Sequence, residues 1–292
     1  MKSQQIDLRS LLNSFLAVDS ASSDSQRLEE VLSAVEHDIQ SMRDFLEILV
    51  NTSLWQAWNI EPNPYRAMIL TVGSEIDRLA TLLHEPAFHS KKHMKDVCLM
   101  LSYLLRQEEI KQHERIQPPW VTSSTEKWQL LLAAAAHDLG HPGLINATPY
   151  ELEQQSLDLL KALLLRFDED VGFIPVALES IAPWILATDH GQYQALLHRL
   201  SIDPPEHVDC LAMLLVEADL ACSVLPVRGP LLTRRLCDEW AGPYPEKSIA
   251  LRNQVGYLSF LASLQFVSPH SAHAGIATIL QQSLSQLRTE SS

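Results

Sequence analysis

Four histidines and one aspartate stand at spacings that suit the binding of a divalent metal ion. His137 and Asp138 form a dipeptide, and His141 follows three residues later, all within the segment HDLGHPGLIN. His89 and His93 lie four residues apart in AFHSKKHMKDV. Zinc accepts imidazole nitrogen together with carboxylate oxygen, and carboxylate oxygen also suits magnesium and manganese. These residue types therefore indicate a mixed histidine and aspartate metal site.

His89 and His93 also fit a helical pattern. The apolar residues after them, from Val97 to Leu104, recur at spacings of three and four, which places both imidazoles on the buried face of one helix. Two histidines on an apolar face are, without partners, more often ordinary core or surface residues than metal ligands. The pair therefore becomes informative only together with the other donors.

Asp219 is a further candidate ligand on an apolar helix. It follows Leu215 by four residues in HVDCLAMLLVEADLACSVL and falls on the same stripe. A buried carboxylate without a cation is costly, so we expect Asp219 to be protonated, paired or bound to a metal. An ordinary ion pair or a helix cap is the alternative for this residue.

The elements that position these residues are predicted to be helices. Apolar residues recur at helical spacing through one amphipathic helix over 28–49, and no segment alternates apolar and polar residues as a strand would. Ser123 and Glu126 form a capping box for a helix that ends near Gly140. Thr148 and Pro149 predict that a new helix begins near 149. HDLGHPGLIN is then a helix end followed by a short loop.

Charge and composition restrict the class of protein. The chain has 292 residues and 14 more acidic than basic side chains, which argues against binding nucleic acid by general electrostatic attraction. Any phosphate ester would need positive charge supplied locally, by a metal or a few placed cations. The four cysteines lie far apart without a CxxC pair, and no membrane span or signal peptide is visible. We therefore expect a cytoplasmic protein with reduced thiols and no membrane partner, whose oligomeric state the sequence leaves open.

The order of four motifs resembles the catalytic domain of the class I 3′,5′-cyclic nucleotide phosphodiesterases, within the HD-domain superfamily of metal-dependent phosphohydrolases. The motifs are H-x3-H at 89–93, HDLGHPGLIN at 137–146, ADL at 218–220 and NQVGYLSF at 253–260. The resemblance covers roughly residues 84–268. It implies an all-α, compact multi-helix bundle with a binuclear metal site, formed by a catalytic domain over 76–292 behind an N-terminal helical extension over 1–75.

The resemblance also implies which residues hold the metals. His93, His137, Asp138 and Asp219 match the ligands of a first ion, which is zinc in the family. Asp138 would bridge to a second ion, magnesium or manganese. Two divalent ions carry more positive charge than the two aspartates carry negative charge, so the pocket would attract one phosphodiester within an acidic protein.

Other residues match the family's catalytic and substrate-binding positions. His89 matches the general acid that protonates the departing 3′ oxygen, and His141 matches a histidine that contacts the bridging solvent or the phosphate. Asn146 matches the asparagine that closes the HD motif. Gln254 matches the glutamine that hydrogen-bonds the purine edge, and Tyr257 takes the place of the aromatic that stacks on the base. A surface glutamine and a core tyrosine are the alternative for this last pair.

The chain departs from the family after the HD motif. The connection is shorter, and LEQQS at 152–156 stands where the family has Leu-Glu-Asn-His-His, so that Glu153 matches the family's glutamate near the bridging water while both histidines are missing. We expect hydrolysis of a cyclic nucleotide, cAMP or cGMP, to the 5′-monophosphate through a metal-bridging hydroxide. The alternatives are a phosphohydrolase for another nucleotide or phosphoester, and a nucleotide-sensing module that has lost turnover.

Overall fold

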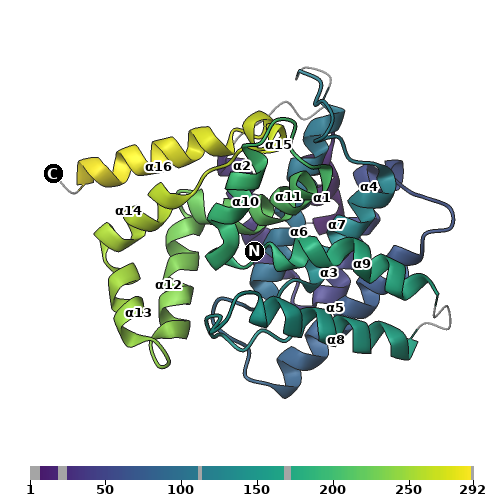
Figure 1. Ribbon diagram of the computed structural model, residues 1–292, viewed down its shortest axis with the longest axis horizontal. Helices are drawn as coiled ribbons and strands as arrows, with labels where there is room; N and C mark the ends of the chain where they lie inside the picture. Colours follow the sequence, from purple (N-terminus) through teal and green to yellow (C-terminus); the bar gives the residue numbers. More distant parts are fainter. Residues whose placement is uncertain (1–6, 19–24, 111–113, 168–171, 291–292) are drawn as a thin grey trace, which may run out of the picture.

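The computed structural model describes residues 7–18, 25–110, 114–167 and 172–290, and the regular elements of this part of the chain are all helical (Figure 1). The predicted all-α fold class is confirmed. The α-helices are α1 (Leu8–Leu16), α2 (Ser25–Asp38), α3 (Met42–Val50), α4 (Ser53–Ala57), α5 (Pro64–Leu82), α6 (Lys91–Leu105), α7 (Ser124–Ala136), α8 (Glu151–Phe167), α9 (Phe173–Leu186), α10 (Tyr193–Leu200), α11 (His207–Ala221), α12 (Arg228–Trp240), α13 (Pro245–Arg252), α14 (Gln254–Ser263), α15 (Pro269–His273) and α16 (Ile276–Glu290). Three short 3₁₀ helices complete the set: η1 (Arg106–Glu109), η2 (His190–Gln192) and η3 (Cys222–Val224).

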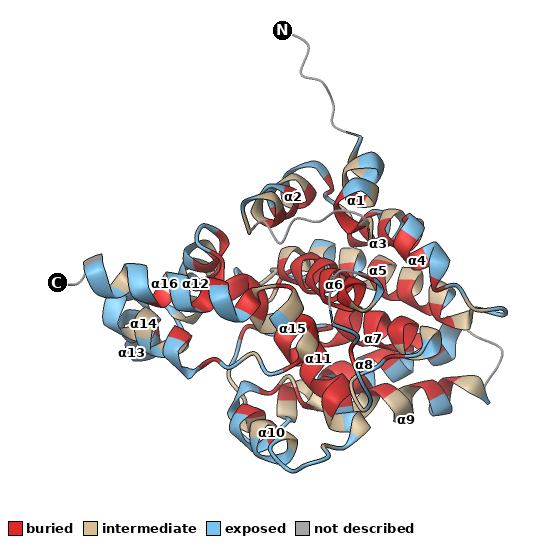
Figure 2. Cartoon of the chain, turned by 90° about the horizontal axis from the view of Figure 1, so that it is seen from above, coloured by how far each residue is buried: buried red, intermediate tan, exposed pale blue. Residues whose placement is uncertain are grey.

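Helices α6, α7 and α11 form the centre of the bundle. α6 is buried from His93 to its end, α7 from Lys127 to its end, and α11 from Cys210 to Ala218 (Figure 2). A helix that is buried on every side must be surrounded by other helices. α5, α8 and α9 pack around this centre. The metal-ligand candidates lie at or near the ends of these three central helices, where a rigid core holds the backbone.

The helix predicted over 28–49 is two helices, because the chain breaks between α2 and α3. Ser41 caps α3, and its side chain accepts a hydrogen bond from the Asp44 amide (3.1 Å). Asp77 of α5 adds a second cap by accepting from the amides of Met42 (2.8 Å) and Arg43 (3.1 Å). Apolar residues keep the helical spacing of three and four across the break, so this spacing alone does not show that the helix is interrupted.

The capping box at the start of α7 is confirmed: the Ser123 side chain accepts from the Glu126 amide, and the Glu126 carboxylate accepts from the Ser123 amide. The prediction for the next helix was wrong by two residues, because α8 begins at Glu151. The side chain of Asn146 caps the start of α8, because its Oδ1 accepts a hydrogen bond from the Leu152 amide at 2.8 Å. Tyr150 lies between them in the left-handed conformation, with φ 65°.

The N-terminal helices share one hydrophobic core with the rest of the molecule. Buried side chains such as Leu12, Phe45 and Leu131 belong to the same cluster. α5 continues without interruption across the predicted boundary between the extension at 1–75 and the catalytic domain at 76–292. The segment 1–75 is therefore packed into the bundle wherever the structure describes it.

Helices α12, α13 and α14 form an arm on one side of the bundle, with α16 beside it (Figure 1). The four cysteines are buried and free, as expected from their spacing. No single helix in the described residues has the length and apolar composition needed to cross a membrane, although the bent pair His207–Val224 and Arg228–Trp240, which meet at 98°, has them jointly.

Candidate active site

The four predicted metal ligands converge from three central helices. His93 lies in the first turn of α6, His137 and Asp138 follow the end of α7, and Asp219 lies near the end of α11. His93 Nε2 is 2.9 Å from Asp219 Oδ1 and 3.5 Å from Asp138 Oδ2, and His137 Nε2 is 3.2 Å from Asp138 Oδ2. Donor atoms of His93, His137 and Asp138 all lie within 4.8 Å of one another. Two nitrogens and two carboxylates thus point at one small volume.

This donor set fits a divalent cation. His137 Nε2 is buried without a hydrogen-bond partner among the described residues, while its Nδ1 is 2.9 Å from the Ala134 carbonyl oxygen. Burial lowers the pKa of His137, but the charges of Asp138 and Asp219 outweigh it and raise the pKa to about 9. The pKa of Asp138 lies well below its usual value because the charges of His137 and His89 outweigh burial. The two carboxylates therefore require positive charge beside them, and a divalent ion provides it together with a partner for Nε2.

His89 lies beside the metal donors but not on their helix. The prediction of one helix face for His89 and His93 was wrong, because α6 begins at Lys91 and His89 lies in the turn before it. Glu239 of α12 holds this turn: its Oε1 is 2.5 Å from His89 Nδ1, and its Oε2 accepts from the amides of Phe88 (2.8 Å) and His89 (3.0 Å). With Nδ1 bound to a carboxylate, Nε2 is the nitrogen of His89 that remains available to a substrate.

His141 stacks on His89, with ring centroids 3.7 Å apart. Burial, aided by the positive charge of His89, lowers the pKa of His141 to about 4, so this ring is neutral at pH 7. The Gly143 amide donates to His141 Nδ1 at 3.1 Å, which assigns the remaining ring proton to Nε2. His141 therefore presents an N–H donor.

Asn146 and Glu153 are joined directly, although the connection between them is short. Asn146 Nδ2 donates to Glu153 Oε2 at 2.8 Å, while Asn146 Oδ1 takes the Leu152 amide. Burial raises the pKa of the Glu153 carboxyl, and the hydrogen bond from Asn146 offsets only part of this effect. The loop conformation is completed by Asp189, which accepts the Tyr150 amide at 2.9 Å.

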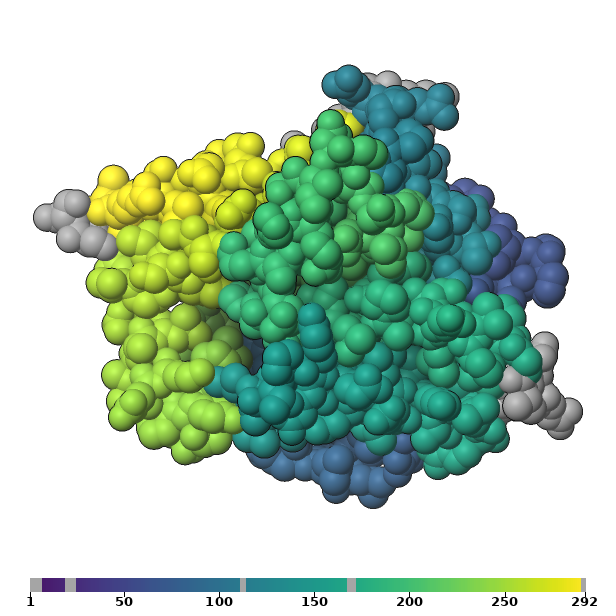
Figure 3. All heavy atoms as spheres, viewed as in Figure 1, coloured from purple at the N-terminus to yellow at the C-terminus, as the bar shows by residue number. Residues whose placement is uncertain are grey.

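These groups face a cavity of about 600 Å³ between the central helices and the arm. Figure 3 shows the hollow between the yellow-green arm and the teal segment that follows α7. Its floor carries the histidines, the two aspartates, Asn146 and Glu153. Its outer wall is formed by Thr233, Leu236 and Trp240 of α12 and by Lys247 of α13. The ionisable groups of the candidate metal site thus lie opposite a wall that combines apolar side chains with Thr233 and Lys247.

Gln254 and Tyr257 are not among the residues that line this cavity. Gln254 Nε2 donates to the Leu287 carbonyl oxygen of α16 at 2.9 Å. The Tyr257 hydroxyl donates to the Ser223 carbonyl oxygen at 3.2 Å, in a space left open because Gly229 has no side chain. A Cβ atom at Gly229 would lie 2.6 Å from that hydroxyl. The structure therefore places both predicted base-binding residues in packing contacts, and their roles in base recognition stay predictions.

Phe260 takes the aromatic position in the cavity instead. It lies three residues after Tyr257 on α14 and faces His190, with ring centroids 6.2 Å apart. In the sequence, Phe260 is only the last residue of the NQVGYLSF motif. Its position follows from the direction of α14, which the spacing of residues does not determine.

Sequence reasoning also missed Glu239 and Asp189. Glu239 is separated from His89 by 150 residues and belongs to an amphipathic helix, in which a glutamate is ordinarily a solvated residue. Asp189 lies directly before His190 at a helix end, where acidic residues are common caps. A buried carboxylate in each of these two places is visible only in the assembled fold.

Comparison with known proteins agrees with this geometry. Residues 88–159 match the model of the 3′5′-cyclic nucleotide phosphodiesterase family, and this segment holds His89, His93, the HD motif, Asn146 and Glu153. No curated protein matches the chain.

Two solved structures have a similar fold. The phosphodiesterase domain of Salpingoeca rosetta rhodopsin phosphodiesterase is 17% identical, with a TM-score of 0.56 over 84% of this chain and 94% of that one. LmjPDEB1 in complex with IBMX is 16% identical, with a TM-score of 0.65 over 96% of this chain and 97% of that one. The metal-site segment is therefore similar to the 3′5′-cyclic nucleotide phosphodiesterase family, and the chain shares the all-helical fold of these two phosphodiesterase structures.

Proposed function

We propose that this protein is a metal-dependent phosphodiesterase that hydrolyses a 3′,5′-cyclic nucleotide to the 5′-monophosphate. The observation that carries the proposal is the convergence of four metal donors beside a histidine that a buried carboxylate orients. A structural metal site has no need of such a histidine, whereas a leaving alkoxide needs a proton donor. The family match over the same segment supports this assignment.

His93, His137, Asp138 and Asp219 would hold the first cation, with Asp138 shared with a second. Bound divalent cations supply Lewis acidity and lower the pKa of water, which provides a nucleophile near neutral pH. Zinc at the first position agrees with the two imidazoles, and magnesium or manganese at the second agrees with the carboxylate oxygen of Asp138.

His89 would serve as the general acid for the 3′ oxygen. Burial lowers its pKa, but the charge of Asp138 and the hydrogen bond and charge of Glu239 raise the pKa overall. A raised pKa favours the imidazolium form, in which Nδ1 remains bound to Glu239 while Nε2 gives up its proton. General acid catalysis of this kind contributes about 10²–10⁴ in rate.

The remaining polar groups would orient the phosphate and its attacking water. His141 is neutral and donates from Nε2, which suits a phosphate oxygen. Glu153, whose pKa is raised by burial, accepts a hydrogen bond from Asn146 and leaves its other oxygen toward the cavity. Phe260 and His190 supply an aromatic wall on which a nucleobase can stack.

A phosphohydrolase for a different nucleotide or phosphoester is the second candidate. It is favoured by the position of Gln254, whose amide is bonded to Leu287 rather than directed into the cavity. The short connection between the HD motif and α8 also leaves the cavity mouth without the additional chain that the family places there.

Product assays on cAMP, cGMP and a generic phosphodiester, with added zinc, magnesium or manganese, distinguish the candidates. Preference for a cyclic nucleotide supports the first, and hydrolysis without preference supports the second. Nucleotide binding without turnover under every metal condition would show a sensing module and overturn both.

Two variants test the assigned roles within the same assay. We expect Asp138→Ala to lose bound metal and turnover together, and His89→Ala to keep its metal while losing most turnover. Full activity of the His89 variant would show that the acid is another group.

A further inference from the structure

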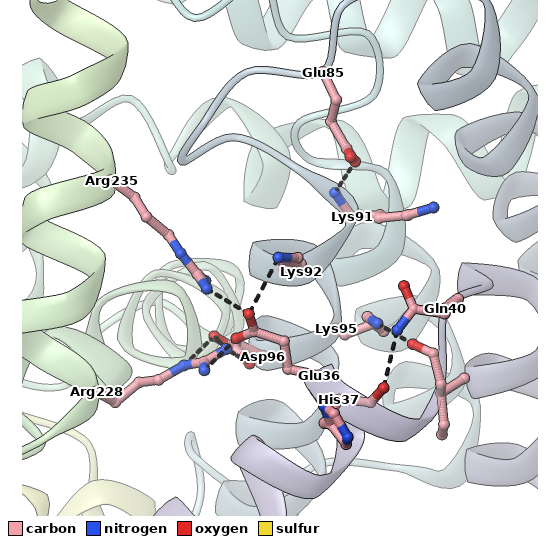
Figure 4. Close-up of polar contacts among 11 residues, drawn as sticks. Glu36, His37, Gln40, Glu85, Lys91, Lys92, Lys95, Asp96, Arg228 and Arg235 are labelled. Atoms are coloured by element: carbon pink, nitrogen blue, oxygen red, sulfur yellow. Dashed lines mark hydrogen bonds and ion pairs between the residues drawn. The ribbon is translucent and has the colours of Figure 1, made fainter.

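Glu36 of α2 connects the N-terminal part of the chain to the arm. Its carboxylate forms ion pairs with Arg228 and Arg235 of α12, and with Lys92 of α6 at 3.3 Å (Figure 4). Burial alone would raise the pKa of Glu36, but hydrogen bonding by Arg235 and the charges of Arg228 and Arg235 lower it to about 2. Glu36 is therefore ionised at neutral pH.

Arg228 is shared between α2 and the centre of the bundle. Asp96 of α6 is buried and receives hydrogen bonds from Arg228 Nε (2.8 Å) and Nη2 (2.6 and 2.7 Å), while Arg228 Nη1 donates to Glu36. A bidentate guanidinium and carboxylate pair is directional as well as strong. One end of Arg228 is thus fixed to the core and the other to α2.

A second carboxylate of α2 holds the beginning of α12. Glu29 Oε1 accepts from the amides of Val227 (2.6 Å) and Arg228 (2.8 Å). Val227 is the residue before the helix and has no side-chain oxygen to cap it. Helix starts leave amides unsatisfied, and a carboxylate there also interacts favourably with the helix dipole. α2 therefore supplies the cap that α12 lacks.

α2 is itself fixed to α6. The buried Lys95 ammonium donates to the carbonyl oxygen of Ile39, just beyond the end of α2, at 2.5 Å. Together with the ion pair between Lys92 and Glu36, this contact joins the C-terminal end of α2 to the helix that carries His93. α2 is thus a bridge between α6 and α12.

The position of α12 determines two features of the active site. Glu239, in its last turn, holds the His89 ring and the amides of residues 88 and 89. Thr233, Leu236 and Trp240 form part of the outer wall of the cavity. A displacement of α12 would therefore change both the orientation of the acid and the width of the substrate cavity.

We propose that Glu36 is a positioning residue: together with Glu29, it makes helix α2 hold α12, and through α12 the cavity wall and the partner of His89, in the arrangement that catalysis needs. The N-terminal helices then act on turnover without contacting substrate. The kinetic part of this inference rests on the proposed function, whereas its structural part does not.

The test compares Glu36→Gln with Asp77→Asn. Both replace a carboxylate by an amide at a contact between helices, but Asp77 caps α3 and does not touch α12. For Glu36→Gln we expect faster amide hydrogen exchange confined to α12 and α13. We also expect KM to rise about tenfold and kcat to fall. The resulting loss in kcat/KM corresponds to at least about 1.4 kcal/mol. For Asp77→Asn we expect faster exchange in α3 and an unchanged KM.

A loss of folded protein lowers the apparent kcat without changing KM, so the rise in KM separates positioning from stability. In the double variant Glu36→Gln with Arg235→Gln, kcat/KM should fall by less than the product of the two single-variant factors. Each single substitution already breaks the same contact between Glu36 and Arg235. Unchanged exchange in α12, an unchanged KM, or the same effects from Asp77→Asn would overturn the inference. If the wild-type protein turns over no substrate, the proposed function fails, and hydrogen exchange in α12 still decides whether Glu36 holds it.

Discussion

Replacement of Glu239 by glutamine tests how the acid is oriented. The carboxylate accepts three hydrogen bonds, from His89 Nδ1 through Oε1 and from the amides of Phe88 and His89 through Oε2. The glutamine amide has one oxygen and one NH₂ group. If its oxygen stays with the backbone amides, the NH₂ group faces Nδ1, and if it turns to Nδ1, the backbone amides lose their acceptor.

Either arrangement removes a hydrogen bond that involves a charged group, which is worth about 1.5–3 kcal/mol. If that energy is lost from the transition state, kcat falls by about 10- to 150-fold, since 1.36 kcal/mol is a factor of ten. KM should change little, because Glu239 contacts the acid and not the substrate. Asp238→Asn is the matched control, since Asp238 is the adjacent residue and pairs only with the exposed Arg252 in the described structure.

The pH dependence gives a second measurement. Despite burial, Asp138 and Glu239 raise the pKa of His89, which extends the protonated form of the acid to higher pH. Loss of the Glu239 charge lowers that pKa, so the alkaline limb of the kcat profile should move to lower pH. A variant with wild-type kcat and an unmoved alkaline limb would refute the argument that Glu239 orients and charges His89.

Further expected outcomes concern the metals, the base and one helix cap. Removal of metal by a chelator should abolish turnover and lower the melting temperature, because Asp138 loses its countercharge. Adding the ion back should restore both. Turnover that survives verified metal removal would contradict this prediction. Phe260→Ala should raise the KM for the nucleotide about tenfold, because about 1–3 kcal/mol of stacking is lost. The same KM in the variant and the wild type would show that the base does not stack on Phe260. Gln254→Ala tests the predicted base contact: a large rise in KM would show that this residue turns into the cavity with substrate, and an unchanged KM would assign it to the packing contact with Leu287. Ser123→Ala should lower the free energy of unfolding by about 0.5–2 kcal/mol in urea titrations, and no change would mean that Glu126 alone sustains the start of α7.

The sequence predicted the parts of the site that depend on local spacing. His137, Asp138 and His141 occupy one helix end and its turn, so their proximity follows from a few residues of chain. Asp219 was identified because a carboxylate on an apolar stripe must find positive charge. These arguments need only the period of a helix and the cost of burying a charge.

Other parts depended on how distant helices meet. The interruption between α2 and α3 is stabilised by Ser41 and by Asp77 of α5, and the local apolar pattern contains no sign of either cap. The orientation of α14 turns Phe260 rather than Gln254 into the cavity, although both lie in one motif. Glu239 reaches His89 only because the end of α12 packs against the turn that precedes α6. Such contacts depend on how the helices pack against one another, and the spacing of apolar residues along one helix does not specify that packing.

The separation of Glu239 from the metal donors has a consequence for the order in which the site is made. The four donor residues end at Asp219, whereas α12 begins at Arg228. In a chain synthesised from its N-terminus, the whole ligand set is present before the partner of the acid has been added. The residues that would hold the cations are therefore added to the chain first, and the residue that orients the acid is added last, in the helix that packs against α2 and α6.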